Sequence, residues 1–389
     1  MTRRIAIVGG GVAGLLTAHL LQRSGHRVTV LSGQRPNDLR GGRILSTQCV
    51  FGARLRPERD AGLALWDDEA PAITKGRLSL WLDRDCVLDW FADLVGGPAQ
   101  SVDHRLKLAA WLEMLDDVAY RTVGEDELDH LAADHDLVLV ATGRGGGFFA
   151  RNADLSPHTE PQRQIAAVYL RIPNSTSDTT SIRWSMVPGV GELLVLPALT
   201  FTGPCYALLI EALPDGPWDV WRDRPGPDEL WRRIRLLLRD IPREHDELAA
   251  TTLTDERATL TGAITPTVHH PVAVLPSGRA VLGLGDAVVV NDPLTAPGAN
   301  SAVTAAAMHA EAIDAHTGPF GADWMQRTHD AWWHAPGGGR DTTTVANALL
   351  NPPPHLLDIL QSAATDPSLQ RKFARVLETT EDADWLIGH

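Results

Sequence analysis

The stretch RRIAIVGGGVAGLLTAHLLQRSGHRVTVL, residues 3–31, decides the fold of this 389-residue chain. Residues 5–8 are an apolar run, glycines follow, and apolar residues then recur at helical spacing over residues 12–23. After a further glycine, a second apolar run covers residues 27–31. A strand, a glycine turn, a helix and a second strand within about 30 residues predict a Rossmann-like α/β unit.

The glycines of this stretch form a GxGxxG motif. Gly9 permits the tight turn, Gly11 lets the backbone approach a pyrophosphate, and Gly14 lets the helix pack closely on the strand. The first helical residues, Val12 and Ala13, offer free N–H groups and the positive end of the helix dipole to phosphates. The motif therefore predicts a dinucleotide-binding site.

The end of the second predicted strand lacks the acidic residue that usually binds the adenosine ribose. The residues there are Leu31, Ser32, Gly33, Gln34 and Arg35. We expect the ribose contact to come from Ser32, Gln34 or Arg35, or from water.

Composition excludes several classes of function. Lysine and arginine number 35 and aspartate and glutamate 49, so the net charge of 35 − 49 = −14 does not favour a nucleic-acid-binding protein. The three cysteines (Cys49, Cys86 and Cys205) form no CxxC pair, which argues against disulfides and zinc and fits a reducing cytoplasm. No metal site is predicted, no segment reaches the roughly 18 apolar residues of a membrane helix, and the N-terminus is not a signal peptide.

Two later segments identify the expected dinucleotide. Residues 136–143, DLVLVATG, read as a buried strand that ends at Thr142 and Gly143. Residues 281–287 read as another strand, which ends at Gly285 and Asp286, and a helix follows over residues 300–313. An aspartate at a strand end can accept hydrogen bonds from ribityl hydroxyls, and a helix start at residues 298–300 can point N–H groups at the pyrimidine edge of a flavin. Together with GxGxxG, this pattern predicts FAD.

These motifs carry a resemblance to a known family. GxGxxG, GGRILST (41–47), SVDHRL (101–106), DLVLVATG, GEL (191–193) and the GLGD…DP…GAN segment occur in order. The chain resembles the oxygenase component of styrene monooxygenase and its indole-oxidising relatives, up to about residue 313. The resemblance implies a two-component monooxygenase. A separate NAD(P)H:flavin reductase makes reduced FAD, which reacts with O2 on the oxygenase to a C4a-hydroperoxide. A homodimer is left open.

The resemblance also implies residue roles. It places Arg43, Ser46 and Asn300 at the reaction centre as catalytic residues. Cofactor contacts are expected from the following residues: Gly9, Gly11, Val12, Ala13, Gly14, Ser32, Gln34, Arg35, Arg43, Arg105, Thr142, Gly143, Gly285, Asp286, Pro293, Gly298, Ala299 and Asn300. Two departures from the family bear on substrate choice. Ser46 stands where an asparagine is expected, and residues 331–340 replace an arginine-rich stretch.

The middle of the chain predicts an antiparallel sheet over the flavin. Residues 168–172, 181–186, 192–196 and 206–210 read as short strands with turns between them. In the resembled family such a sheet roofs a mostly apolar substrate pocket. Substrate contacts are expected from Ser46, Trp184, Leu196, Leu199, Phe201, Leu209 and Leu294, although strand alternation alone would place half of such residues in the core.

The fold class expected is α/β, similar to flavoprotein hydroxylases. It comprises a discontinuous FAD-binding domain (1–75, 98–162 and 262–320), a β-rich substrate domain (76–97 and 163–261) and a C-terminal helical segment (321–389). The expected reaction is epoxidation or hydroxylation of an aromatic alkene or indole. The alternatives are a self-sufficient NAD(P)H-dependent aromatic hydroxylase, disfavoured because residues 141–144 contain no DG motif, and a non-catalytic FAD-binding protein.

Overall fold

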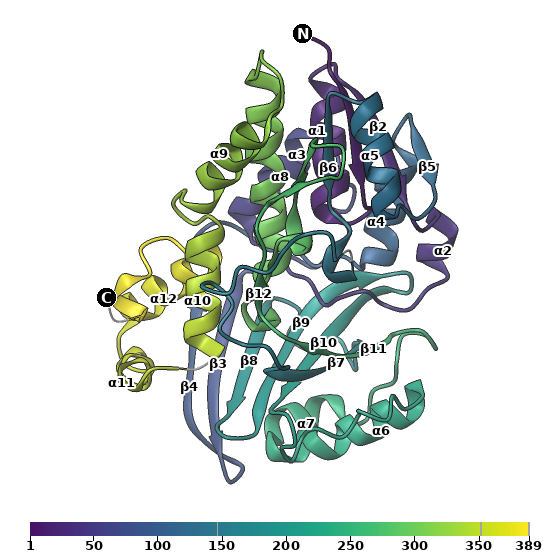
Figure 1. Cartoon of the computed structure of the whole chain (residues 1–389). Coiled ribbons are helices and arrows are strands. Elements are labelled where there is room, and N and C mark those ends of the chain that lie inside the picture. The colour runs from purple at the N-terminus through teal and green to yellow at the C-terminus, as the bar shows by residue number, and fades with distance from the viewer. Residues whose placement is uncertain (146, 351, 388–389) are drawn as a thin grey trace.

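The structure is a computed structural model that describes residues 1–145, 147–350 and 352–387. Its first layer is a six-stranded sheet of order β13-β14-β6-β1-β2-β5, in which only β13 runs antiparallel to its neighbour (Figure 1). The strands are β1 (Arg4–Val8), β2 (Arg27–Ser32), β5 (Val118–Tyr120), β6 (Leu137–Val140), β13 (Val272–Val274) and β14 (Ala280–Gly283). This is the predicted Rossmann-like unit.

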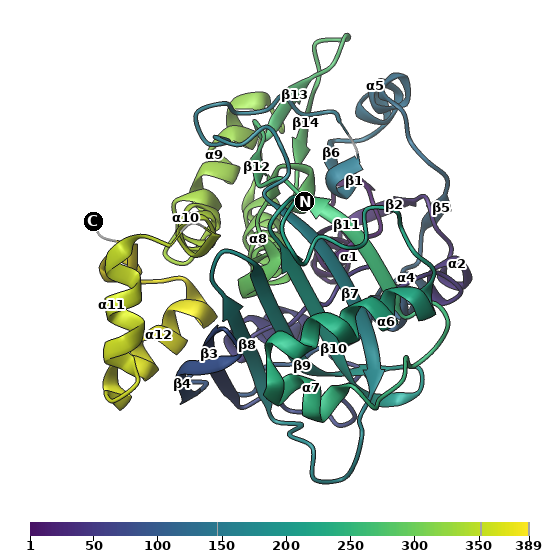
Figure 2. The same ribbon diagram turned by 90° about the horizontal axis from the view of Figure 1, so that it is seen from below.

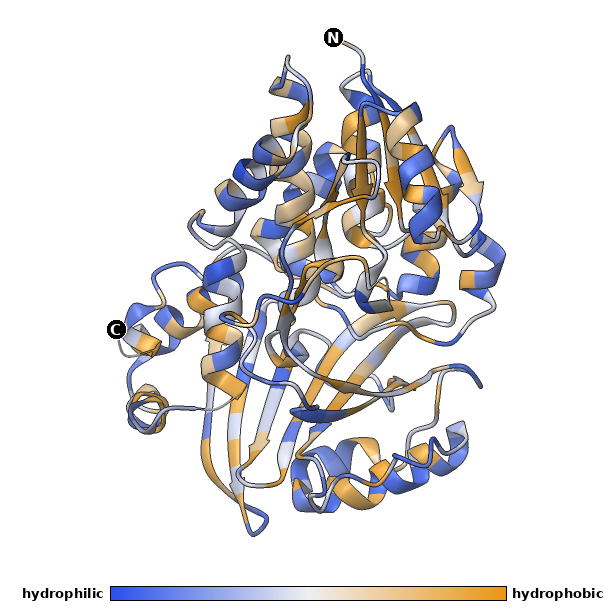
Figure 3. Cartoon of the chain, viewed as in Figure 1, coloured by the Kyte–Doolittle hydropathy of each residue, from blue (hydrophilic) through white to orange (hydrophobic). Residues whose placement is uncertain are grey.

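The parallel sheet is covered on its faces, so its central strands are apolar throughout. Ile5, Ala6 and Ile7 of β1 have no exposed surface, and Figure 3 shows these strands as a continuous hydrophobic block. The predicted helix 12–23 is α1 (Val12–Arg23), which packs against α8 (Pro297–Ala315). Shorter helices complete this layer: α2 (Pro36–Arg40), α3 (Arg56–Asp60), α4 (His104–Glu113) and α5 (Glu125–Asp134).

The second layer is a seven-stranded sheet of order β11-β7-β10-β9-β8-β3-β4 (Figure 2). Its strands are β3 (Lys75–Leu82), β4 (Asp85–Asp93), β7 (Arg163–Arg171), β8 (Ser181–Val187), β9 (Gly191–Thr200), β10 (Gly203–Ala212) and β11 (Thr259–Ile264). The four predicted strands are present and longer than expected. The chain adds β3, β4 and β11, and all neighbours are antiparallel except β3 and β8.

Alternation along these strands gives the sheet two different faces. Ile165, Ala167 and Leu209 lie on the face toward the FAD-binding layer. Val168 and Leu208 lie on the opposite face, under α6 (Pro227–Leu237) and α7 (Pro242–Leu248), which cross it in Figure 2. The two faces therefore differ. One is covered by α6 and α7, and the other borders the FAD-binding layer and can form the wall of a site.

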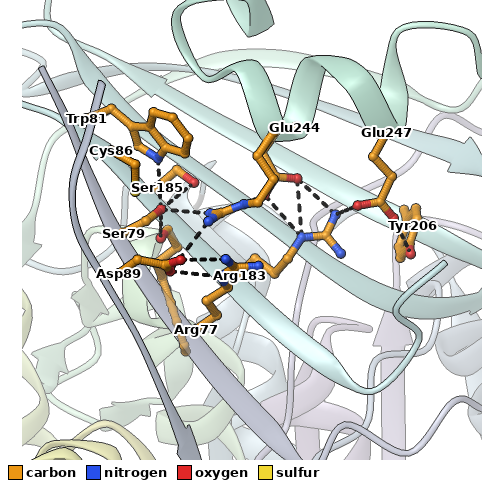
Figure 4. A network of polar contacts seen from close by, with 12 residues as sticks. Arg77, Ser79, Trp81, Cys86, Asp89, Arg183, Ser185, Tyr206, Glu244 and Glu247 are labelled. Carbon is orange, nitrogen blue, oxygen red and sulfur yellow. Dashed lines mark hydrogen bonds and ion pairs between the residues drawn. The ribbon is translucent and has the colours of Figure 1, made fainter. Parts of the chain in front are cut away.

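A polar network ties α7 to this sheet (Figure 4). The Arg183 guanidinium on β8 donates to the Glu244 carboxylate at 2.9 Å and lies 3.2 Å from a Glu247 oxygen. Closer to the sheet edge, Arg77 Nε donates to Asp89 Oδ1 at 2.8 Å. Arg183 and Glu244 are only 3% and 0% exposed. Each buried charge would be costly without the other, so the ion pair allows both to be buried.

The C-terminal part is helical, as predicted. Its helices are α9 (Ala322–Trp333), α10 (Gly339–Leu350), α11 (Pro354–Ala363), α12 (Pro367–Thr379) and α13 (Asp384–Ile387). Helix α12 packs on β4, and Trp332 and Trp333 are buried in helix packing. Within the three described ranges, no helix combines the length and apolarity needed to cross a bilayer.

A short ladder pairs β12 (Thr267–Val268) with β15 (Val289–Val290) between the two large sheets. Single helical turns occur at Gly52–Leu55, Gly143–Gly145, Leu238–Asp240, Gly285–Ala287 and Pro293–Thr295. The last two turns lie beside the site described next.

Candidate active site

A cavity of 850 Å³ lies between the two large sheets. One wall includes residues that directly follow parallel strands: Gly9 after β1, Gly33 after β2, Arg121 after β5, Ala141 after β6 and Leu284 after β14. Ligands of open α/β sheets bind at these carboxyl ends, where strand order reverses. The other wall is the seven-stranded sheet. The cavity thus has a wall that fits a dinucleotide and, opposite it, an apolar wall formed by the seven-stranded sheet.

The GxGxxG turn has the geometry that its glycines predict. Gly9 has φ +128°, and a Cβ there would lie 2.1 Å from the Ala141 carbonyl oxygen. A Cβ on Gly14 would lie 2.5 Å from the Gly9 carbonyl oxygen, so Gly14 permits close packing of α1 and does not line the cavity. No side chain caps α1, which leaves its first N–H groups free for phosphate.

Gly11 differs from its neighbours because a Cβ added to it would meet no other protein atom within 4 Å. Its φ of −86° and ψ of 178° suit any residue, so only a ligand requires a glycine at this place. We expect Gly11→Ala to raise the dissociation constant of FAD about tenfold, with apo stability unchanged within about 0.5 kcal/mol. FAD fluorescence titration and thermal unfolding measure the two effects.

Gly124 provides the matched control. It precedes α5 with φ −96° and ψ 177°, has equally open surroundings and does not line the cavity. Gly124→Ala is expected to leave FAD affinity and stability unchanged. Equal FAD affinity in Gly11→Ala and the native chain would contradict close approach of the pyrophosphate to this turn.

We call the wall formed by the ends of the parallel strands the cofactor wall. Residues 285–299 form its end opposite the GxGxxG turn. Gly285 has φ +63°, and Asp286 follows it on a single helical turn. Burial raises the pKa of Asp286, and the positive charge of Arg144 lowers it. Ala296 adopts a left-handed φ of 54° and turns the chain into α8, which begins at Pro297 rather than at residue 300. Gly298 and Ala299 line the cavity at this uncapped helix start.

The structure brings most of the predicted cofactor residues to the cavity. Those that line it are Gly9, Gly11, Val12, Ala13, Ser32, Gln34, Thr142, Gly143, Gly285, Asp286, Pro293, Gly298 and Ala299. Arg35 and Arg43 are exposed and do not line it. The Arg35 guanidinium lies over the Tyr120 ring, 4.9 Å from its centroid.

Arg105 does not contact the cavity, contrary to the prediction. Its guanidinium donates to Asp103 at 2.9 Å and to both oxygens of Asp255 at 3.1 and 3.0 Å, and it lies over the Phe201 ring. Two carboxylates bind the buried cation, so it joins α4 to the segment before β11 instead of reaching a phosphate.

Asn300 is likewise occupied by the protein. Its amide nitrogen donates to the carbonyl oxygens of Cys49 and Ala296 at 2.9 and 2.8 Å, and its oxygen accepts from the Phe51 N–H at 3.0 Å. Asn300 does not line the cavity. It ties the start of α8 to residues 49–51, and its predicted catalytic role stays a prediction.

Only Ser46 and Leu209 of the predicted substrate residues line the cavity. Trp184 donates its indole N–H to the Leu294 carbonyl at 2.9 Å, and Leu196 packs in the core behind the wall. Leu294 and Leu199 are buried without reaching the cavity. Phe201 occupies the β9–β10 turn and is 43% exposed, because the strand ends before it.

The sequence did not single out several residues that line the cavity. The apolar ones on or beside the seven-stranded sheet are Ile165, Ala167, Leu260 and Ile264, and the polar ones include Thr47, Gln48, His104, Arg121, Arg144 and Asn291. His104 lies in the SVDHRL motif beside Arg105, so only the helix geometry decides which of the two faces the cavity. Its Nδ1 shares a hydrogen bond with Ser46 Oγ at 3.1 Å. Burial lowers the pKa of His104 to about 3, so its imidazole is neutral.

The residues present fit FAD. The wall offers a glycine cradle, two uncapped helix starts and an aspartate, Asp286, that lines the cavity just after a strand. In the described part of the chain, Thr142 Oγ1 and both side-chain polar atoms of Asn291 are buried without a hydrogen-bond partner. Because both residues line the cavity, these groups are suited to hydrogen bonds with a bound cofactor.

Comparison with known families agrees with this geometry. Residues 7–48 match the family model of an NAD(P)-binding Rossmann-like domain. Residues 142–246 match a family model described as a substrate-binding domain of styrene monooxygenase A. The second match spans β7–β10, α6 and α7, and hence most of the seven-stranded layer.

Whole-chain relatives extend the match. The chain is 27% identical to styrene monooxygenase StyA of Pseudomonas fluorescens, over 96% of this chain and 92% of the relative. It is 28% identical to StyA of a Pseudomonas species, over 82% and 79%. A flavoprotein/dehydrogenase from Cytophaga hutchinsonii has the same fold, with a TM-score of 0.68, 13% identity and coverage of 97% and 93%. The resemblance predicted from the motifs is confirmed: the chain is a styrene monooxygenase-like, FAD-dependent monooxygenase.

Proposed function

We propose that the chain takes reduced FAD from a separate NAD(P)H:flavin reductase and uses O2 to epoxidise or hydroxylate a small aromatic alkene or an indole-type substrate. The observation that carries this proposal is the continuity of the cavity. It runs from the glycine turn to a floor of apolar side chains, including Ala167 and Leu209, that suits a small aromatic molecule. The similarity to styrene monooxygenases supports the choice of substrate class.

The proposed domains follow the two walls. Segments 1–75, 98–162 and 262–320 contribute the residues that fit the cofactor, and segment 163–261 contributes Ile165, Ala167, Leu209 and Leu260. We propose that the first group is the FAD-binding domain and that the second, with residues 76–97, is the substrate domain. The contact between them is the place where cofactor and substrate meet.

The residues of this site bind, orient and exclude water rather than perform acid–base chemistry. Bound reduced FAD would activate O2 and supply the oxygen atom that is transferred. Ile165, Ala167 and Leu209 exclude water from the substrate side. Ser46 and the neutral His104 present a hydrogen-bonded pair without net charge, which can orient a polar substituent. Oxygen transfer to an electron-rich double bond requires no general base.

The part of the site expected to bind the adenosine of FAD is suited to a flavin that is exchanged with a partner protein. No acidic residue stands at the end of β2 or in residues 33–35 that follow it, and Gln34 and Arg35 there are exposed. A cofactor held without the charged ribose contact binds less tightly. The absence of a DG motif after β6 disfavours direct use of NAD(P)H.

The test supplies the pure chain with chemically reduced FAD, ¹⁸O2 and either styrene or indole. Mass spectrometry should detect one ¹⁸O atom per product molecule without any reductase present. In a parallel reaction, NADH or NADPH with oxidised FAD should give no product until a flavin reductase is added. Substrate-stimulated NADPH oxidation without a reductase would overturn the two-component proposal, and FAD binding without product would overturn the oxygenase proposal for these substrates.

A further inference from the structure

Three carboxyl groups, two of them buried, meet beside the cavity. Glu192 on β9 and Glu211 on β10 are direct cross-strand partners on the face toward the FAD-binding layer. Asp292 approaches them from the segment that follows β15, and Glu211 and Asp292 are 1% and 2% exposed. Like charges in such a cross-strand pair repel each other, so three ionised carboxylates here are not stable without compensation.

Among the described residues, the cation that faces these carboxyl groups is Arg163 of β7. Its Nε and Nη2 donate to the two oxygens of Glu192, each at 3.0 Å. Nη2 also donates to the Leu350 carbonyl oxygen at 2.9 Å, and Nη1 donates to the Gln162 carbonyl oxygen at 3.0 Å. The guanidinium therefore donates its hydrogen bonds to Glu192 and to backbone carbonyl oxygens. It donates none to Glu211 or Asp292.

The carboxyl groups of Glu211 and Asp292 lie next to one another, so the charge of each acts on the other. Among the described residues, no N–H or hydroxyl group donates to either oxygen of Glu211 or to Asp292 Oδ2. Asp292 Oδ1 already accepts the Leu294 N–H at 3.2 Å. A hydrogen bond between two carboxyl groups requires a proton on one of them.

We propose that Glu211 holds a proton at neutral pH and donates it to Asp292, and that this carboxyl pair positions residues 291–296 at the cavity. The charged groups that face Glu211 are Arg163 from β7, Glu192 from β9 and Asp292 itself. Burial is the largest cause that raises the pKa of Glu211, and the charges of Asp292 and Glu192 raise it further. Asp292 remains the acceptor because the Leu294 N–H stabilises its charge.

The pair acts on the site through the segment that Asp292 begins. Asn291, Pro293 and Ala296 line the cavity, and Asp292 caps the Pro293–Thr295 turn that leads to the left-handed Ala296. Loss of the shared proton would place two adjacent anions under this turn and displace it. Glu211 and Asp292 are positioning residues for the cavity, and their effect on catalysis rests on the proposed function.

The first test is the pH dependence of unfolding of the FAD-free full chain, for native protein, Glu211→Gln and the exposed control Glu160→Gln. Glu211 has a higher pKa folded than unfolded, so unfolding releases a proton and native stability falls as the pH rises above the unfolded pKa. Glutamine has no proton to release. The ratio of unfolding constants, native over Glu211→Gln, should rise about tenfold per pH unit until the folded pKa is reached. Glu160→Gln should keep the native profile.

The second readout is infrared spectroscopy, which keeps the proposal testable if Glu211→Gln does not fold. The native protein at pH 7 should show the C=O band of a buried protonated carboxylic acid, which titrates away at alkaline pH. Glu160→Gln should retain this band, and Glu211→Gln should lack it. A native spectrum without the band at pH 7, or a pH-independent ratio of unfolding constants, would overturn the proposal.

A third readout separates this proposal from the proposed function. Affinity for reduced FAD, measured anaerobically at pH 7 and pH 9, should fall at least threefold in the native chain and stay constant in Glu211→Gln. If the carboxyl pair titrates as expected but no styrene or indole product forms, the proposed function fails and the pair stands. If product forms and affinity is equally pH-dependent in both proteins, the positioning role fails and the function stands.

Discussion

Glu244→Ala is expected to lower the free energy of unfolding by about 3–5 kcal/mol, because it leaves the buried Arg183 cation without its main partner. Arg183 donates to both Glu244 oxygens, at 3.2 and 2.9 Å, from a position between β8 and α7. Glu247 lies 3.2 Å from the guanidinium but is 24% exposed, so it replaces Glu244 only in part. Urea unfolding followed by circular dichroism measures the loss.

Two further variants separate the buried charge from the packing of α7. Glu247→Ala is expected to cost less than about 1 kcal/mol, because that partner is partly solvated. The double variant Arg183→Met with Glu244→Leu removes both charges and should recover most of the stability lost in Glu244→Ala. A loss of under about 1 kcal/mol in Glu244→Ala would contradict a charge penalty at this site. A double variant as unstable as Glu244→Ala would contradict it too.

The parts of the fold that sequence predicts well are those with local signals. Residues 12–23 form a helix within the predicted bounds because the glycine turn and the apolar spacing both act within the segment. Strand ends are less well predicted. Residues 168–172 were expected and Arg163–Arg171 is observed, because pairing with β10 and β11 extends the strand. The β3–β4 hairpin was not predicted. Besides pairing with each other, its strands contact β8 and α12, which are distant in sequence.

The cofactor wall could be predicted because it consists of backbone turns. Gly9 and Gly285 mark turns by residue type alone, and both line the cavity. Side-chain roles depend on partners distant in sequence. Arg105 is paired with Asp255 as well as with Asp103 of its own motif, and Asn300 donates to the Cys49 carbonyl oxygen. Neither Asp255 nor Cys49 is marked by the motif that contains the predicted residue. The same limit hides the pairing of Glu211 with Asp292.

The substrate wall shows why alternation misses a site. Strand periodicity separates the two faces of β9 and β10 correctly, but it does not say which part of a face borders empty space. Leu196 and Leu209 share a face of the sheet, and only Leu209 lines the cavity. The part of each strand that borders the cavity is determined by how the FAD-binding layer packs on the sheet. No residue within the strand predicts it.

Ala167→Trp is expected to lower kcat/KM for the aromatic substrate about 10³-fold, equivalent to about 4 kcal/mol of transition-state binding. Ala167 lies on β7 between Ile165 and Tyr169, and its small side chain borders the cavity opposite the cofactor wall. The indole side chain of the introduced tryptophan would fill the space that the aromatic ring of the substrate occupies. Since no cofactor-wall residue changes, the affinity for reduced FAD should stay within about threefold of the native value.

The measurement is product formed per reduced FAD consumed, together with the hydrogen peroxide released. When the substrate is excluded, O2 should still be consumed, so peroxide should replace product in nearly equal amount. Val274→Trp places the same side chain on an exposed position of β13, outside the cavity, and controls for added bulk. Joint loss of FAD binding and product in Ala167→Trp would mean that β7 supports the cofactor rather than the substrate. Unchanged turnover would place the substrate elsewhere, because an indole and an aromatic substrate cannot occupy the same volume of a closely packed wall.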